Sequence, residues 1–284
     1  MSDRVASDYH SQVRTEAQDE SPIALREAAL RVGGRTLWAD LDLSVGRGEL
    51  VAVLGPNGAG KSSLIRVLLG QLALASGRAT VAGKDPGAAG RDIGYVPQQK
   101  LFERGSPLRA RDLVGFGLDG TEFGLPLRRS SRNAAIDAAL EQVGARHFGS
   151  RPVGLLSGGE QQRLRIAQAL VSTPRVLLCD EPLLSLDLAH QRAVLDSIDG
   201  FRRREQAGVL LVTHDINPVL HMVDRVLYLA PGGHRVGTPE EVLKGSVLSE
   251  LYGVHVDVLT VHGRILVVAA DGSVDGVHDH EEAS

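Results

Sequence analysis

The fold is decided by the stretch Gly55-Pro56-Asn57-Gly58-Ala59-Gly60-Lys61-Ser62, which matches the phosphate-binding pattern G-x-x-x-x-G-K-S/T without a gap. Its glycines let the backbone curl so that several amide N–H groups point at a polyphosphate. Lys61 then reaches the terminal phosphates, and the Ser62 hydroxyl is a candidate Mg²⁺ ligand. We include Ser63 in the predicted nucleotide-binding set. The stretch therefore predicts a site for a nucleotide and Mg²⁺.

The sequence around this loop predicts a strand before it and a helix after it. The apolar run 50–54 is typical of a parallel strand buried on both faces, and residues 61–69 predict a helix whose positive end faces the anion. Similar apolar runs at 175–179, 208–212 and 225–229 predict further strands of the same sheet.

Two other regions depart from that pattern. Alternating segments between Ile23 and Val45, broken by two glycines, predict an antiparallel hairpin. Residues 98–157 contain a helical pattern that places Ile136, Leu140 and Val143 on one face. We therefore expect an α/β fold: a P-loop NTPase core with an antiparallel β subdomain and a helical insertion.

Composition narrows the function classes. The 284 residues are 43% hydrophobic and 23% charged, with a net charge of -4, which gives no support to nucleic-acid binding. No apolar stretch approaches the ~18 residues that a helix needs to cross a bilayer, and the polar first twenty residues do not resemble a secretion signal. The single cysteine, Cys179, excludes an internal disulfide, and its apolar neighbours predict a buried thiol.

A second glycine-containing segment, Ser157-Gly158-Gly159-Glu160, opens a predicted helix. Residues 164, 167, 170 and 171 give that helix a buried face, and its N-terminus is a second candidate anion-binding end. One nucleotide seldom needs two such ends from one chain. A glycine-rich helix cap without a ligand is the alternative interpretation.

Paired carboxylates, Asp180 and Glu181, follow a buried strand at the edge where ligands of open α/β sheets bind. Asp180 is placed to hold Mg²⁺ directly or through water, and Glu181 is placed to activate a water that attacks the γ-phosphate. The alternative is a pair that merely caps the next helix.

Three single residues complete the candidate site. Gln98 follows a predicted strand and opens the helical insertion, so its amide could contact Mg²⁺ and the attacking water. Asp187 closely follows the carboxylate pair. His214 ends another apolar strand, where a contact with the γ-phosphate or the water is favoured over a structural role.

Taken together and in this order, the motifs resemble those of the ATP-binding subunits of ABC transporters, from about Ile23 to Tyr252. The resemblance implies that Lys61 and Ser62 belong to the Walker A motif and Gln98 to the Q-loop. It implies that residues 157–160 are the signature and that Asp180 and Glu181 are the Walker B pair. Asp187 would be the D-loop residue and His214 the H-loop switch.

The family resemblance also implies partners and a mechanism. Two copies would face head to tail, each ATP lying between the Walker A motif of one and the signature helix of the other. Glu181 would be the general base, and His214 the γ-phosphate contact. Membrane permease subunits and, indirectly, an extracytoplasmic substrate-binding protein would be partners. The chain would then lie peripherally on the cytoplasmic face of the membrane.

One position departs from the family pattern. An aromatic residue that stacks on adenine usually follows the first strand, whereas Val32 stands there in this chain. Loss of the ring could weaken nucleotide binding by about 0.5–1.5 kcal/mol. Trp38 lies nearby in the sequence, but the sequence does not give its side-chain direction.

The C-terminal third is similar in amino-acid sequence to zinc or manganese importers, so we expect this chain to take part in the import of a divalent metal ion. An ATPase for another substrate or an exporter, a soluble ABC-type protein and a metal-responsive regulatory module are the alternatives. The regulatory module would bind a metal ion through the histidines at His278 and His280. We favour the alternative, in which these histidines are part of a polar chain end and bind no metal.

The expected division of the chain is a flexible tail over 1–21, an ATPase domain over 22–245 with a helical subdomain over about 98–165, and a C-terminal extension over 246–284 with a histidine-containing tail.

Overall fold

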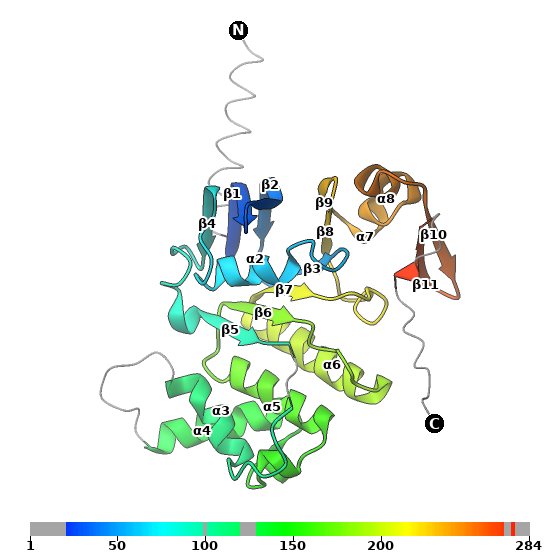
Figure 1. The fold of residues 1–284 in the computed structure, drawn as a ribbon. Coiled ribbons are helices and arrows are strands. Elements are labelled where there is room, and N and C mark those ends of the chain that lie inside the picture. The colour runs from blue at the N-terminus through cyan, green and yellow to red at the C-terminus, as the bar shows by residue number, and fades with distance from the viewer. Residues whose placement is uncertain (1–20, 99–100, 120–128, 270–273, 276–284) are drawn as a thin grey trace.

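The computed structural model describes residues 21–98, 101–119, 129–269 and 274–275. A six-stranded sheet lies at its centre in the order β5-β6-β7-β3-β8-β9 (Figure 1). Neighbouring strands are parallel except β8 and β9, which pair antiparallel. The strands are β3 (Leu50–Leu54), β5 (Ile93–Val96), β6 (Val176–Asp180), β7 (Gly208–Val212), β8 (Arg225–Ala230) and β9 (Gly233–Gly237).

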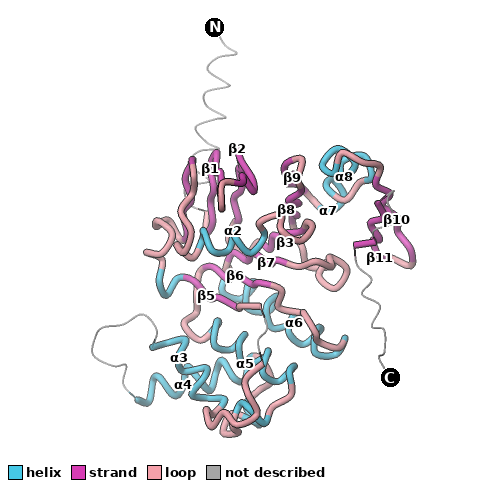
Figure 2. Tube along the Cα trace, in the orientation of Figure 1, coloured by secondary structure: helices cyan, strands magenta, loops and turns pink. Residues whose placement is uncertain are grey.

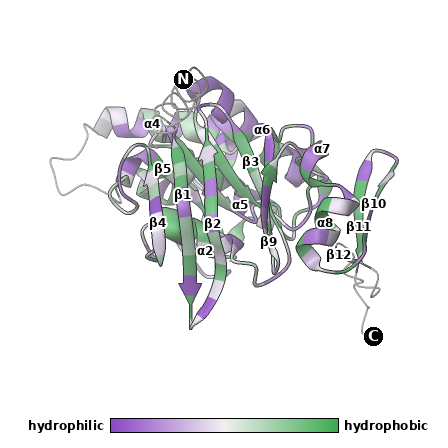
Figure 3. Ribbon diagram, turned by 90° about the horizontal axis from the view of Figure 1, so that it is seen from above, coloured by the Kyte–Doolittle hydropathy of each residue, from purple (hydrophilic) through white to green (hydrophobic). Residues whose placement is uncertain are grey.

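The inner strands are continuous apolar runs because both of their faces are buried. Along β3, Leu50, Ala52 and Leu54 belong to one hydrophobic cluster, while Val51 and Val53 belong to a second cluster on the other face. Successive side chains of a strand point to opposite faces, so the alternation follows from strand geometry. Figure 3 shows the hydrophobic residues concentrated on the inner strands and on α2 (Lys61–Leu68).

The second cluster is closed by an antiparallel sheet with the order β2-β1-β4. Its strands are β1 (Ile23–Val32), β2 (Arg35–Val45) and β4 (Ser76–Val81). The hairpin expected between 23 and 45 is thereby confirmed. On this face, α2 shares the covering of the central sheet with the strands of the antiparallel sheet.

Helices cover the first cluster and form a separate layer below the sheet (Figure 2). Ile136, Leu140 and Val143 are each buried in it, as the helical pattern predicts. The layer contains α3 (Ala110–Asp119), α4 (Arg129–Gln142), α5 (Gly158–Leu170) and α6 (Leu188–Glu205). Short 3-10 turns occur at Gly90–Asp92, Arg146–Phe148 and Val153–Leu155.

The C-terminal part adds two short helices and a small antiparallel sheet beside β8 and β9 (Figure 1). Val258, Ile265 and Val267 turn one face of this sheet towards the first cluster. The elements are α7 (Pro239–Val242), α8 (Gly245–Tyr252), β10 (Val256–Val261), β11 (Arg264–Ala269) and β12 (Val274–Asp275).

The α/β class with an antiparallel subdomain and a helical insertion is confirmed. Cys179 is fully buried as expected, and burial raises the pKa of its thiol far above the ordinary value. Within the described ranges, no helix has both the length and the apolar character needed to span a bilayer. Residues 1–20 of the tail expected over 1–21, and the histidines at 278 and 280, lie outside the described residues.

Candidate active site

The loop that follows β3 is shaped by contacts that only its own residue types allow. Gly55 has φ 136°, and a Cβ there would lie 1.9 Å from the carbonyl oxygen of Leu229 in β8. The Lys61 side chain folds back over the loop, where Nζ donates to the carbonyls of Gly55 (2.6 Å) and Pro56 (3.1 Å). The ammonium group is therefore held at the mouth of the loop.

The tip of the loop is open to solvent, since Asn57 and Gly58 are exposed and Ala59 is half-buried. Gly60 caps α2, whose first turn contains no acidic residue. The backbone N–H groups of this end and the helix dipole thus present positive charge, the arrangement that binds phosphate. Ser63 lies half-buried in the same first turn.

Ser62 and Asp180 come from α2 and from the end of β6, and they meet beside the loop. The Ser62 hydroxyl donates to Asp180 Oδ1 at 3.0 Å. Burial raises the pKa of Asp180, as does the charge of Glu181, while Ser62 and Lys61 act in the opposite direction. A carboxylate and a hydroxyl side by side are the oxygen donors that Mg²⁺ prefers, so these residues fit that ion.

Glu181 and His214 form the next pair along the same edge of the sheet. His214 Nδ1 lies 2.9 Å from Glu181 Oε2, and the Glu181 backbone N–H donates to the Val212 carbonyl in β7 at 3.0 Å. Glu181 has φ 48°, a conformation that costs a non-glycine residue free energy and is frequent at functional sites.

The hydrogen bond between Glu181 and His214 has the largest effect on the pKa of both side chains. It lowers the pKa of Glu181 against the effect of burial, and it raises the pKa of His214, again against burial. A carboxylate that stays ionised and points into the space beside a phosphate-binding loop is placed to accept a proton from water.

The signature segment starts α5 with a reciprocal cap. The Glu160 N–H donates to Ser157 Oγ (3.3 Å), and the Ser157 N–H donates to Glu160 Oε2 (2.8 Å). Burial pushes the pKa of Glu160 upward, but its hydrogen bonds with Ser157 and the charge of Arg151 bring it below the ordinary value. Glu160 thus fixes the first turn of α5.

Asp187 caps the following helix, α6, and is joined to the signature through a histidine. Its carboxylate accepts from the His190 N–H (2.9 Å) and lies 2.7 Å from His190 Nδ1. The His190 ring packs on Gly159 so closely that a Cβ there would lie 2.1 Å from ring atom Cδ2. The two motifs therefore form one rigid junction within the chain.

Gln98 and the signature segment make no hydrogen bond to Ser62 or Asp180 within the described ranges. Gln98 follows β5, the strand that pairs with β6, and is exposed. The signature helix is the larger separation: α5 packs in the hydrophobic cluster on one face of the central sheet, whereas α2 packs in the cluster on the other face.

Sequence reasoning missed the supporting roles of three residues, Trp38, Gln162 and His190. Trp38 is 3% exposed, and its indole Nε1 lies against Gly60, so it supports the loop from below and cannot stack on adenine. Gln162 is fully buried and donates from Nε2 to the Pro182 carbonyl (2.9 Å), which connects α5 to the turn after Glu181. His190 was detectable as the third residue after a capping aspartate.

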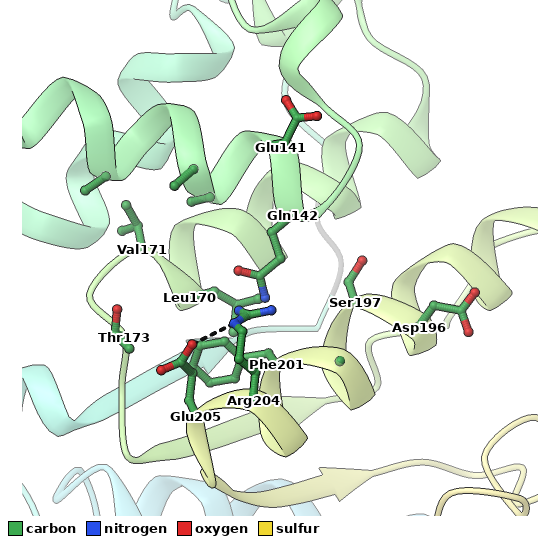
Figure 4. A pocket seen from close by; sticks show the side chains of 14 residues that line it. Glu141, Gln142, Leu170, Val171, Thr173, Asp196, Ser197, Phe201, Arg204 and Glu205 are labelled. Carbon is green, nitrogen blue, oxygen red and sulfur yellow. Dashed lines mark hydrogen bonds and ion pairs between the residues drawn. The ribbon is translucent and has the colours of Figure 1, made fainter.

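A cavity of about 610 Å³ lies elsewhere, between α4, the end of α5 and α6 (Figure 4). Ala139, Gln142, Leu170 and Phe201 are among its lining residues, and none of the predicted site residues lines it. The candidate chemistry therefore belongs to the exposed edge of the sheet.

Known proteins resemble this chain over most of its length. The family described as ABC transporter matches residues 38–184. The zinc import ATP-binding protein ZnuC of Photorhabdus laumondii subsp. laumondii is 35% identical over 233 residues, which cover 82% of this chain and 84% of that protein. The protein of the same name from Cereibacter sphaeroides is 37% identical over 231 residues, covering 81% and 88%.

A solved structure agrees with the sequence relatives. CbiO1 from Clostridium perfringens, part of the ABC transporter complex CbiONQ, superposes with a TM-score of 0.70 at 26% identity, over 81% of this chain and 93% of that chain. The resemblance inferred from the motifs is thereby confirmed, and the chain belongs to the ABC transporter family.

Proposed function

We propose that this chain binds ATP with Mg²⁺ and hydrolyses it as the ATPase subunit of a membrane transporter. The observation that carries the proposal is the row of polar side chains along one edge of the sheet: Ser62 beside Asp180, then Glu181 beside His214. Family membership supports ATP as the nucleotide.

Each side chain has a role in this proposal. The N–H groups of residues 55–60 and the Lys61 ammonium bind the phosphates, and Ser62 with Asp180 holds Mg²⁺. Bound Mg²⁺ neutralises phosphate charge. Glu181 accepts a proton from the attacking water as a new P–O bond forms at the γ-phosphorus and the bond to the bridging oxygen breaks, releasing ADP and phosphate. His214 orients Glu181 and contacts the γ-phosphate.

The signature acts, in the same proposal, on ATP held by a second copy. The support for this is that α2 and α5 pack in hydrophobic clusters on opposite faces of the sheet, so their first turns belong to different layers of one copy. Ser157, Gly158 and Gly159 would then close the site of the facing copy, with Asp187 beside them.

The transported substrate we propose is Zn²⁺, entering the cell. The support is that the curated relatives at 35% and 37% identity are named zinc import ATP-binding proteins. The partners would be permease subunits and an extracytoplasmic binding protein, with this chain held peripherally at the cytoplasmic face.

Replacing Glu181 by Gln tests the catalytic assignment. Gln cannot accept the proton, so we expect the ATPase rate to fall by about 10²–10⁴-fold. ATP affinity should stay within a factor of about two, since the phosphate contacts remain. Steady-state phosphate release and ATP titration give the two quantities. Substantial residual hydrolysis by the variant would reject Glu181 as the base.

Radioactive zinc uptake tests the substrate. In cells whose own copy of the gene is deleted, the wild-type chain should restore uptake of ⁶⁵Zn²⁺, and the Glu181→Gln chain, expressed at the same level, should not. Restored uptake of Mn²⁺ alone, or loss of zinc from preloaded cells, would replace the proposal by manganese import or by export.

A further inference from the structure

The loop that carries His214 is attached to the C-terminal sheet by one side chain, Asn217. Its Nδ2 donates to the Ile265 carbonyl (3.0 Å), and its Oδ1 accepts from the Ile265 N–H (2.7 Å). The side-chain amide thus pairs with the backbone of β11 as a neighbouring strand would. Both partners are half-buried, and 48 positions separate them along the chain.

Among the described residues, no strand other than β10 pairs with β11 at Ile265. Val261 and Arg264 are paired at the end of the β10–β11 hairpin, so the next pair, Thr260 and Ile265, is of the type whose N–H and C=O groups point away from the partner strand. On the other side, β12 pairs only with Val267 and Val268 within the described ranges. Within the described part of the chain, it is Asn217 that hydrogen-bonds to these outward-pointing groups of Ile265.

The same residue is joined to the turn next to His214. Asp215 Oδ1 accepts from the Asn217 backbone N–H (2.9 Å) and from Asn217 Nδ2 (2.8 Å). Thr213 Oγ1 donates to the Asp215 carbonyl (2.9 Å) and accepts from the Asp215 N–H (3.2 Å). His214 therefore sits in a hydrogen-bonded turn whose far end is fixed to β11.

The near end of that turn is fixed to the central sheet, since the Thr213 N–H donates to the Val53 carbonyl at 3.2 Å. The hairpin is itself anchored, because Val258, Ile265 and Val267 pack against the core. The histidine loop is thus held from two sides by elements that belong to different parts of the sequence.

We propose that Asn217 is a positioning residue, which uses the hairpin 256–269 to hold the His214 loop so that His214 stays on Glu181. The proposal rests on the proposed ATPase function and adds to it that the C-terminal hairpin controls turnover. Loosening the attachment lowers kcat, because a misplaced catalytic group costs rate steeply. It leaves KM for ATP nearly unchanged, since the phosphate loop is untouched.

Asn217→Leu removes both hydrogen bonds to β11 while keeping the branching and the number of side-chain heavy atoms, and Asn217→Asp keeps only the acceptor. We expect kcat to fall by about 10–100-fold in both, with KM within a factor of about two. In a His214→Ala background, Asn217→Leu should cause no further loss of kcat, because the histidine through which it acts is gone. Additive losses, or an unchanged kcat in the single variants, would overturn the proposal.

A pair of matched glycine substitutions tests the hairpin itself. Gly263 (φ 76°) ends the turn of the β10–β11 hairpin, and Gly83 (φ 76°) ends a similar turn next to β4; neither would bring a Cβ within 4 Å of another group. Valine at either position therefore adds the same backbone strain. Gly263→Val should lower kcat and Gly83→Val should not. Equal effects would overturn the role of the hairpin.

Hydrogen exchange separates this proposal from the ATPase proposal. Whether or not the wild-type chain hydrolyses ATP, Asn217→Leu and Gly263→Val should accelerate amide exchange in residues 213–217 relative to Gly83→Val. An inactive wild-type chain would reject the ATPase assignment alone. Unchanged exchange in residues 213–217 would reject the attachment, even in a fully active enzyme.

Discussion

At the scale of single residues, Val32 stands where the family resemblance implies an aromatic residue that stacks on adenine. It ends β1, pairs with Arg35 across the hairpin and is 44% exposed. Trp38 cannot replace the missing ring, because it is buried against Gly60. The edge where adenine would lie therefore offers an aliphatic side chain to the base.

Adding the ring should strengthen ATP binding. We expect Val32→Tyr to lower the Kd for ATP by about 2–12-fold, equivalent to about 0.5–1.5 kcal/mol of stacking. Titration followed by the fluorescence of Trp38, the single tryptophan, measures the Kd. Val32→Leu is the control, since it adds apolar area without a ring. Equal affinity in the two variants would contradict stacking at this position.

The pair of Glu181 and His214 predicts how stability depends on pH. The raised pKa of His214 means that its share of the stability is complete below the unfolded value of about 6.5 and is lost as pH rises through the folded value. The lowered pKa of Glu181 means that its share is complete above about 4.3 and is lost at lower pH.

We therefore expect His214→Ala to lower the free energy of unfolding more at about pH 6 than at about pH 9. The difference will be small, because the His214 side chain is 48% exposed and solvent screens the pair. Denaturant unfolding at the two pH values measures it. His221→Ala, at an exposed position nearby, is the control. A larger loss at pH 9 would contradict the charge assignment.

At the scale of elements, the junction of α5 and α6 allows two opposing effects to be weighed. Alanine at Gly159 would favour the helix by about 0.5–1 kcal/mol, but overpacking against the His190 ring costs about 1–3 kcal/mol. The ring cannot move away freely, because Asp187 holds its Nδ1. Overpacking should therefore prevail.

Gly159→Ala is accordingly expected to lower the free energy of unfolding by about 0.5–2 kcal/mol in the wild-type background. In a His190→Ala background the same change should raise it, because the ring is gone and only helix propensity remains. Denaturant unfolding of the four chains gives both differences. Stabilisation by Gly159→Ala in the presence of His190 would show that the junction is looser than described.

The elements also show what the sequence can predict. The bounds of β3 and β7 were predicted to the residue, because burial on both faces leaves an unbroken apolar run. The strand β4 begins with three exposed residues and β9 is exposed or half-buried throughout, so neither has such a run. The motif residues could be predicted because each belongs to a short segment whose residue types indicate its chemistry. The Asn217 side chain contacts the backbone of Ile265, 48 positions away along the chain, and no local pattern encodes this contact.

At the scale of the whole molecule, the central sheet separates the two helices that begin at the predicted phosphate-binding ends. The helix α2 packs in the cluster on one face, and α5 packs in the cluster on the other. The expected division into an ATPase domain over 22–245 and a C-terminal extension stays a prediction. Because Asn217 hydrogen-bonds to β11, the C-terminal extension contacts the loop that carries His214.

Mixing two inactive chains tests the shared site directly. Lys61→Ala disables the phosphate loop of one chain, and Ser157→Arg blocks the signature of the other with a bulky cation. In a head-to-tail dimer of the two variants, the intact loop of the second faces the intact signature of the first. Roughly one quarter of all sites in an equal mixture should then be complete, since half the dimers are mixed and each has one complete site.

We expect each variant alone to be inactive, and the mixture to regain both ATPase activity and ATP-dependent association measured by sedimentation. The control is to mix each variant with a chain that carries both substitutions. Mixed with Lys61→Ala, this double variant forms dimers without an intact phosphate loop. Mixed with Ser157→Arg, it forms dimers without an intact signature. If every site were built within one chain, no mixture could restore it. A mixture that neither associates nor hydrolyses ATP, made from variants that fold like the wild type, would therefore contradict the two-chain site while leaving the phosphate loop itself intact.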